Sequence, residues 1–162
     1  PTNKHVWNIT ASKYDPATVY VSLIGRHDDD FNPYVFKSTD YGKTWVNIAP
    51  TLPGSTNVLR EDPKKTGVLY CGTDLGPYVS TDGGKTWVYL GAGMPNVAVW
   101  DIQVHPRDNV IVAATGVTPG DYLAGVRYRK GGAITNSVVM RSQTRTVRFM
   151  EAYHSFDRKP HY

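Results

Sequence analysis

An eight-residue motif occurs twice in this chain and limits what the chain can fold into more than any other feature does. Residues 38–45 read Ser-Thr-Asp-Tyr-Gly-Lys-Thr-Trp, and residues 80–87 repeat seven of the eight after a period of 42. A proline followed by a β-rich run precedes each copy, and a third such start follows His105-Pro106. A fixed period of this length is typical of folds assembled from repeated supersecondary units. We therefore expect similar units stacked against one another.

Each unit is expected to contain four short strands. In the middle unit, β-branched and aromatic residues cluster at 57–60, 68–72, 78–81 and 86–90, with turn-forming residues between them. Four antiparallel strands repeated in this way are the pattern of a propeller blade. The chain holds about two and a third such units, whereas a closed propeller has about four to eight blades. The expected fold is all-β: an incomplete β-propeller of four-stranded blades followed by a β-hairpin tail.

The repeated motif has a structural explanation. An aspartate before a glycine-containing turn accepts backbone N–H groups, the glycine adopts positive φ, and the tryptophan covers the core of the blade. We therefore assign the motif to the fold rather than to chemistry. The residues with this structural role are Ser38, Asp40, Gly42, Thr44, Trp45, Ser80, Asp82, Gly84, Thr86 and Trp87.

The motif resembles the Asp-box, or BNR, repeat, whose pattern is Ser-x-Asp-x-Gly-x-Thr-Trp. Segments 29–34, 60–63 and 101–108 resemble the sortilin-type propellers of bacteria, which are often labelled glycosyl hydrolases. The resemblance covers about residues 5–112. It implies a binding or carbohydrate-processing role outside the cytoplasm, a protein or carbohydrate ligand, and Asp boxes at the blade periphery, away from any active site.

Composition changes near residues 110–115. Residues 1–114 carry a net charge of −1 and all four tryptophans, whereas residues 115–162 carry a net charge of +5 and no copy of the motif. Two independent shifts at one place indicate a boundary. We expect blade repeats over 1–112 and a different tail over 113–162.

The tail resembles the carboxyl-terminal end of class II fructose-1,6-bisphosphatases over about residues 109–160, through segments 114–128, 137–142, 146–148 and 153–159. This resemblance implies a cytoplasmic sugar-phosphate hydrolase of gluconeogenesis that uses Mg²⁺ or Mn²⁺. The metal-binding motif of that family, Asp-Pro-x-Asp-Gly, is missing, because Asp62-Pro63 is followed by two lysines. No catalytic residue can therefore be assigned from the resemblance, and we do not expect the chain to be active alone.

Basic residues are concentrated in the tail, where residues 134–140 are expected to pair with 146–149 as a hairpin and 121–125 to form a helical turn. Guanidinium groups bind phosphate in a bidentate manner. The candidate phosphate-binding residues are Arg127, Arg141, Arg145 and Arg148. The alternative is a solvated basic edge that prevents sheets from associating. No aromatic row is interleaved with these residues, so nucleic acid is not an expected partner.

The two resemblances meet at Asp108–Thr115, a strand-like segment that suits both families. We infer that the chain is a hybrid. A natural fusion, a laboratory or computational recombination, and an incorrectly assembled sequence all remain open as its origin. The localisation stays open with it, extracytoplasmic for the first parent and cytoplasmic for the second.

Other candidate chemistry is sparse. Asp28, Asp29 and Asp30 form a loop of oxygen ligands that could hold Ca²⁺, although a solvated loop is the simpler interpretation. A glycosidase would need two carboxylates flanking the scissile bond. The available acids are Asp30, Glu61, Asp74 and Asp101, and no spacing singles out a pair. Cys71 lies in an apolar run and is interpreted as a small buried side chain. No cofactor and no membrane span are expected from the sequence.

Three functional hypotheses follow. The first is a non-catalytic propeller-type binding module, the second is a bisphosphatase fragment without its metal site, and the third is a chimera with no evolved activity. An active chain would be a hydrolase of the glycosidase or sugar-bisphosphatase type. In each case exposed strand edges or missing blades favour self-association.

Overall fold

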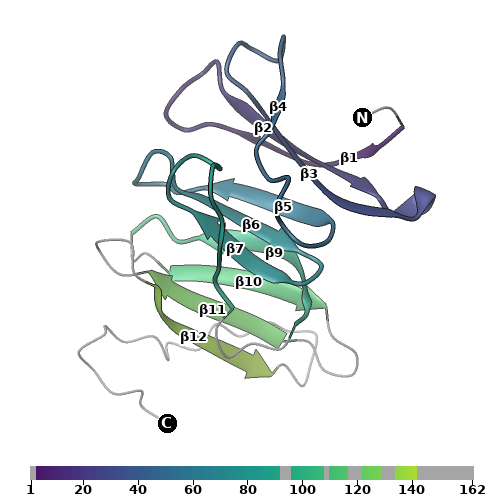
Figure 1. Ribbon diagram of the computed structural model, residues 1–162. Helices are drawn as coiled ribbons and strands as arrows, with labels where there is room; N and C mark the ends of the chain where they lie inside the picture. Colours follow the sequence, from purple (N-terminus) through teal and green to yellow (C-terminus); the bar gives the residue numbers. More distant parts are fainter. Residues whose placement is uncertain (1–2, 92–95, 108–109, 117–121, 129–133, 142–162) are drawn as a thin grey trace.

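The fold consists of three four-stranded antiparallel sheets stacked face to face (Figure 1). The computed structural model describes residues 3–91, 96–107, 110–116, 122–128 and 134–141. The first sheet contains β1 (His5–Ala11), β2 (Val19–Gly25), β3 (Asp30–Ser38) and β4 (Val46–Asn47). The second contains β5 (Thr56–Glu61), β6 (Leu69–Thr73), β7 (Gly76–Ser80) and β8 (Val88–Tyr89). The third contains β9 (Ala98–Val104), β10 (Val110–Gly116), β11 (Tyr122–Tyr128) and β12 (Ile134–Arg141).

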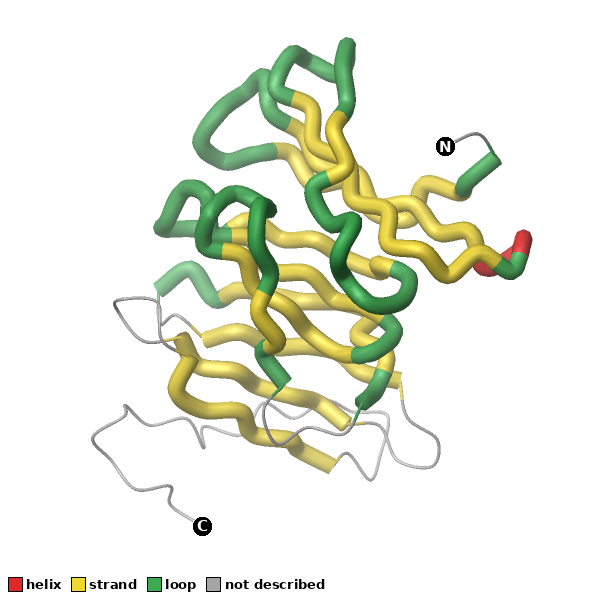
Figure 2. The backbone as a smooth tube through the Cα atoms, in the orientation of Figure 1, coloured by secondary structure: helices red, strands yellow, loops and turns green. Residues whose placement is uncertain are grey.

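In every sheet the strands follow the chain order, with β1, β5 and β9 on one edge and β4, β8 and β12 on the other. The connections lie at the ends of the strands, which leaves the sheet faces free to stack (Figure 2). One short 3-10 helix, η1 (Arg26–Asp28), links β2 to β3. The expected all-β fold of the incomplete-propeller type is confirmed. The described part of the chain contains no helix that could cross a bilayer.

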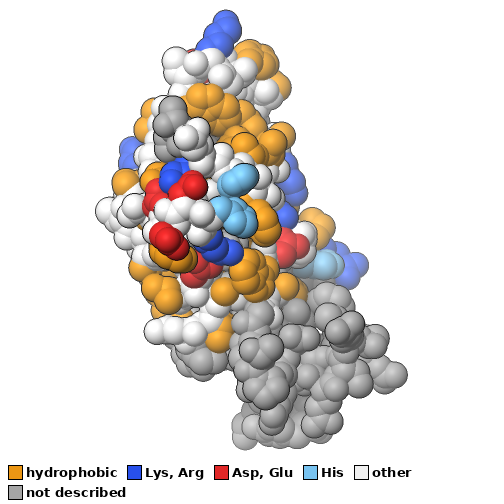
Figure 3. Space-filling view, turned by 90° about the vertical axis from the view of Figure 1, so that its right-hand side faces the viewer, with side chains coloured by type: hydrophobic (Ala, Val, Ile, Leu, Met, Phe, Trp, Pro, Cys, Tyr) orange, Lys and Arg blue, Asp and Glu red, His pale blue; other side chains and the backbone are white. Residues whose placement is uncertain are grey.

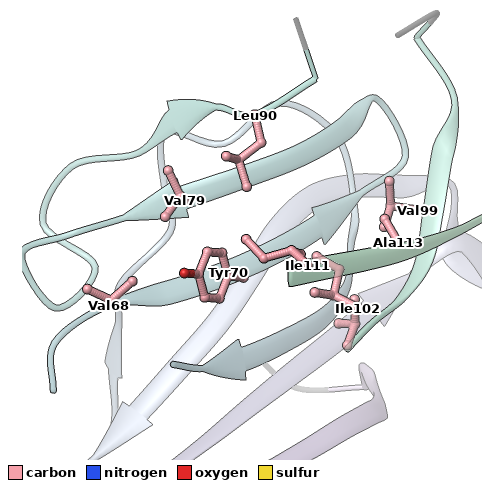
Figure 4. Close-up of a cluster of buried hydrophobic side chains, with 9 residues drawn as sticks. Val68, Tyr70, Val79, Leu90, Val99, Ile102, Ile111 and Ala113 are labelled. Carbon is pink, nitrogen blue, oxygen red and sulfur yellow. The ribbon is translucent and has the colours of Figure 1, made fainter. Parts of the chain in front are cut away.

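Two hydrophobic clusters hold the sheets together. Between the first and second sheets, Tyr20, Val35 and Ala49 contact Leu59 and Cys71. The second cluster lies between the second and third sheets (Figure 4), and its buried members are Val58, Val68, Tyr70, Val79, Leu90, Val99, Ile102, Ile111 and Ala113. All five residues of β6 are buried because this strand lies in the middle sheet, with a neighbour on each face.

The third sheet is more complete than the sequence predicts. The expected helical turn at 121–125 is wrong, because the chain forms β11 from residue 122, and this strand pairs with β10. Residues 134–141 form β12 and pair with β11. The other half of the predicted hairpin, 146–149, lies outside the described residues. Strand β10 runs across the compositional boundary at residue 112, so the third sheet includes sequence from both sides of it.

Candidate functional site

The two copies of the octapeptide form the same hydrogen-bonded turn. In each copy the serine hydroxyl donates to the aspartate at 2.8 Å. The same hydroxyl accepts a hydrogen bond from the backbone N–H of Gly42 or Gly84, also at 2.8 Å. The aspartate accepts the threonine N–H at 2.9 Å and its hydroxyl at 2.6 Å in both copies. Gly42 and Gly84 have φ of 84° and 96°. These hydrogen bonds hold the pKa of Asp40 down to about 2 and lower that of Asp82 as well. All these partners lie within the turn, which is therefore braced by its own residues.

The edge strands β1, β5 and β9, which we call the inner strands, each carry a β-bulge at the same position. The pairing of β1 with β2 skips Trp7, the pairing of β5 with β6 skips Asn57, and the pairing of β9 with β10 skips Trp100. A bulge redirects a side chain and is common next to functional sites. Because the three bulges are structurally equivalent, they place Trp7, Asn57 and Trp100 at the same end of the three inner strands.

A polar cluster has formed around the middle bulge. Arg26 pairs with Asp74 at 2.5 Å and also hydrogen-bonds the Asn57 carboxamide oxygen. The Asn57 amide group donates to Asp74 and to the carbonyl of Val99, each at 3.1 Å. The Arg26 guanidinium lies over the Trp100 ring, 4.8 Å from its centre. Three sheets therefore contribute to one group at the strand ends, with Trp7 and Trp100 half-exposed at 50% and 41%.

Three of the four candidate catalytic acids, Asp30, Asp74 and Asp101, lie at the end of the sheets that carries the bulges, whereas Glu61 ends β5 at the opposite end. Each has its own partner. Asp30 binds Lys4 at 2.8 Å, and Asp101 binds Arg60 at 2.8 Å. Glu61 accepts hydrogen bonds from Ser12, Lys13 N–H and the Tyr20 hydroxyl, and burial next to Glu61 raises the pKa of Tyr20.

The acidic loop at 28–30 is neutralised from within the chain. The Lys4 ammonium lies 2.8 Å from Asp30 and 3.6 Å from Asp28. The hydrogen bond from Lys4 lowers the pKa of Asp30, and the same contact raises the pKa of Lys4. Acidic, basic and histidine side chains gather here on one face of the molecule (Figure 3), with the His5 and His27 rings 5.0 Å apart. In the described part of the chain, no three His, Cys, Asp or Glu side chains are placed to hold a metal ion.

The basic residues of the tail are spread along the third sheet or lie beyond the described residues. Arg127 pairs with Asn136 and Arg141 pairs with Tyr122, which puts the two arginine positions at opposite ends of the β11–β12 pair. Arg145 and Arg148 lie outside the described residues. Cys71 is fully buried, and burial raises the pKa of its thiol well above the ordinary value.

Comparison with known proteins gives two different results for two parts of the chain. The protein-family model described as bacterial fructose-1,6-bisphosphatase, glpX-encoded, matches residues 93–154. A Synechococcus elongatus protein named D-fructose 1,6-bisphosphatase class 2/sedoheptulose 1,7-bisphosphatase is 54% identical over 48 residues, which are 30% of this chain and 14% of that protein. A protein of the same name from Thermosynechococcus vestitus is 46% identical over 52 residues, 32% of this chain and 15% of its own length. The chain thus spans only a small part of these relatives.

Solved structures match the sheet architecture instead. An ancestral GH74 enzyme superposes with a TM-score of 0.67 at 20% identity, over 85% of this chain and 18% of its own. The GH74 xyloglucanase from Xanthomonas campestris superposes with a TM-score of 0.56 at 13% identity, over 72% of this chain and 20% of its own. The structure of YCF48 bound to D1 peptide superposes with a TM-score of 0.52 at 17% identity, over 78% of this chain and 37% of its own. At this identity the likeness concerns the fold alone. The described sheets therefore have a fold like that of part of a β-propeller, and residues 93–154 are similar in sequence to part of the class II bisphosphatases.

Asp74 was among the predicted acids, whereas Arg26, Asn57, Trp7 and Trp100 were not predicted as site residues. Arg26 and Asp74 are 48 positions apart, and they meet because adjacent sheets bring their strand ends side by side. Trp7 and Trp100 contributed only to the count of tryptophans before the boundary. One signal was available: the dipeptide Val-Trp begins near the start of the first and third inner strands, at 6–7 and 99–100.

Proposed function

We propose that the chain is a non-catalytic binding module of the β-propeller type and that its ligand is a glycan. The observation that carries this proposal is the set of equivalent bulges at Trp7, Asn57 and Trp100, of which the two tryptophans are half-exposed. An indole offers a rigid apolar face and one N–H donor. The carbon-bound hydrogens of a pyranose ring stack on such a face, while its hydroxyl groups need hydrogen-bonding partners nearby.

The polar cluster supplies those partners through Arg26 and Asp74, whose side chains are each 23% exposed. Asn57 is buried, and its amide group donates to Asp74 and to the Val99 carbonyl, so it holds Asp74 in place before a ligand arrives. Preorganised polar groups beside an apolar surface are the usual composition of a small-molecule site. One of the proteins with a similar fold is a xyloglucanase, which makes xyloglucan oligosaccharides the first ligands to test.

Binding without hydrolysis fits the distribution of the acids. Hydrolysis of a glycosidic bond by the common mechanism uses two carboxyl groups about 5 to 10 Å apart, on either side of the bond. Here Asp74 is engaged by Arg26, Asp101 is engaged by Arg60, and Glu61 stands at the other end of the strands. The geometry supports recognition of a sugar chain more than cleavage of it.

Isothermal titration calorimetry with xyloglucan oligosaccharides tests the proposal. Trp7→Ala and Trp100→Ala should each weaken binding at least about tenfold, which corresponds to about 1.4 kcal/mol. Tyr41→Asn is the matched control, since Tyr41 is an exposed aromatic residue in the octapeptide turn at the opposite end of the first sheet and has φ of 62°, which asparagine tolerates. No binding by the unchanged protein, or equal losses in all three variants, would refute the glycan site. Binding of an extended peptide instead, with the same dependence on tryptophan, would make this a peptide-binding site.

A second candidate is a segment of a class II bisphosphatase, favoured by the family match over residues 93–154. Its test is the release of phosphate from fructose 1,6-bisphosphate with Mg²⁺ or Mn²⁺. Because the described residues offer no metal cluster, we expect no turnover from the chain alone. Metal-dependent turnover that survives rigorous purification would favour this candidate over the binding module.

A further inference from the structure

The ion pair between Arg26 and Asp74 joins only one nitrogen to one oxygen. The Arg26 Nη2 atom lies 2.5 Å from Asp74 Oδ1. The contacts with Asn57 involve the same two atoms, because Nη2 donates to the Asn57 carboxamide oxygen and Oδ1 accepts the Asn57 amide at 3.1 Å. An arginine and a carboxylate often pair through two parallel hydrogen bonds instead. The single-point contact leaves the other polar atoms of Arg26 and Asp74 available.

These remaining atoms are open to solvent. Within the described part of the chain, Arg26 Nε and Nη1 and Asp74 Oδ2 have no hydrogen-bond partner. The polar side-chain atoms of the described residues that are both buried and unpartnered belong to Ser22, Ser55 and Tyr89. Since the free atoms of Arg26 and Asp74 are not among them, solvent reaches these atoms. The pair therefore presents hydrogen-bond donors beside an acceptor, with no net charge.

The rest of the cluster fixes these atoms next to an indole. The Arg26 guanidinium lies over the Trp100 ring, with its carbon 4.8 Å from the ring centre. Asn57 donates to the carbonyl of Val99, the residue before Trp100, at 3.1 Å. Both the ring and the backbone of the third-sheet bulge are thus held by side chains of the other two sheets. Trp100 is still 41% exposed, so a ligand at this point meets an apolar ring and the ion pair together.

This combination disfavours charged ligands. A carboxylate or phosphate would be attracted by Arg26 but repelled by the free Asp74 oxygen, and a cation would meet the reverse. A neutral group that donates and accepts hydrogen bonds at adjacent positions matches both partners. Two neighbouring hydroxyl groups of a sugar ring are such a group, because each hydroxyl is a donor and an acceptor. When the two hydroxyls are gauche, their oxygens lie about one hydrogen-bond length apart.

We propose that the Arg26–Asp74 pair binds a vicinal diol of a neutral sugar whose ring packs against Trp100. One hydroxyl donates to Asp74 Oδ2, and the neighbouring hydroxyl accepts an N–H of Arg26. The inference rests on the proposed glycan site and specifies the part of the sugar that this site recognises. Asn57 acts as a positioning residue, because its buried amide engages the two atoms of the ion pair that the diol does not use.

Isothermal titration calorimetry with modified ligands tests the contact on the unchanged protein. Cellotetraose has the (1→4)-linked glucan backbone of xyloglucan, with free hydroxyl groups at C2 and C3. Methylation of both hydroxyls removes the donors of the diol and should weaken binding at least about tenfold. Methylation at C6 adds bulk outside the diol and should change the affinity less than about threefold. Equal losses for the two ethers would overturn the diol contact alone. Absence of binding by cellotetraose and by xyloglucan oligosaccharides would refute the glycan site together with this inference.

Asp74→Asn and Asp101→Asn form a matched pair of variants. Both acids bind an arginine Nη2 through one oxygen, at 2.5 and 2.8 Å, but the second oxygen of Asp101 already accepts the Gln103 amide. In Asp74→Asn an amide N–H replaces the free acceptor and can donate to an ether oxygen. The affinity lost on methylation at C2 and C3 should therefore shrink in Asp74→Asn and stay unchanged in Asp101→Asn. The same methylation loss in both variants would overturn the proposal, whatever their affinity for cellotetraose.

Discussion

The first and second sheets contain the same turn in different surroundings. Their octapeptides differ at one residue, and their serine, aspartate and threonine hydrogen bonds agree to 0.1 Å. The surroundings of the two tryptophans nevertheless differ, since the Trp87 indole N–H donates to the Ile48 carbonyl of the first sheet, whereas the Trp45 indole N–H donates to the Gly42 carbonyl within its own turn. The comparison teaches that the motif determines the turn locally, whereas burial is determined by the neighbouring sheet.

The largest contrast is expected between Leu59→Ala and Ile9→Ala. Leu59 is buried between two sheets, so its truncation should remove about 2 to 5 kcal/mol from the free energy of unfolding. Ile9 occupies the equivalent position and is exposed in the single chain, so its truncation should cost less than about 0.5 kcal/mol. Urea unfolding at a chain concentration too low for association measures both. Equal costs would mean that the two positions are not equivalent in burial.

The next contrast concerns two positions in the middle of β2 and β6. Gly72→Ala should destabilise the fold by about 1 to 3 kcal/mol, because the new methyl group would lie 2.7 Å from the Val99 side chain and 2.9 Å from the Val99 carbonyl. Ser22 is the equivalent residue. Its buried hydroxyl has no hydrogen-bond partner within the described structure, so Ser22→Ala should be neutral or stabilising. Thermal unfolding would show the opposite signs, and a destabilising Ser22→Ala would contradict the assignment.

These contrasts mark the limit of what the sequence can predict. The period of 42 and the turn chemistry were readable because both arise within one short segment. The bulges at Trp7, Asn57 and Trp100 were not, because a bulge is a property of the register between two strands. Asp74 was a candidate acid, but its partner Arg26 belongs to another sheet. The tail does not repeat the upstream motif. The sequence therefore predicted only part of a third blade, whereas β11 and β12 complete a four-stranded sheet.

A smaller and equal effect is expected for the two turn serines. Ser38→Ala and Ser80→Ala each remove one hydroxyl that donates to an aspartate and accepts a glycine N–H. Each should cost about 1 kcal/mol, as for a capping hydroxyl. Parallel urea titrations of the two variants measure the costs. The comparison predicts the same value in both sheets, and a difference of more than about 1 kcal/mol would show that the turn is not locally determined.

The smallest effect is a shared dependence on acid. The pKa of Asp40 is held at about 2, below its ordinary value of 3.8, by hydrogen bonds from Thr44 and Ser38, and the pKa of Asp82 is lowered by the equivalent bonds. A lowered folded-state pKa contributes stability that is complete above the ordinary value and is lost as the pH falls through the folded-state value. The urea midpoint should therefore decline below about pH 4, and Asp40→Asn and Asp82→Asn should each flatten that decline by a similar amount. Lys43→Gln is the control, since it changes a charge in the same turn without removing a carboxylate. If only one of the two asparagine variants flattened the acid limb, the turns would differ in electrostatics despite their matching geometry.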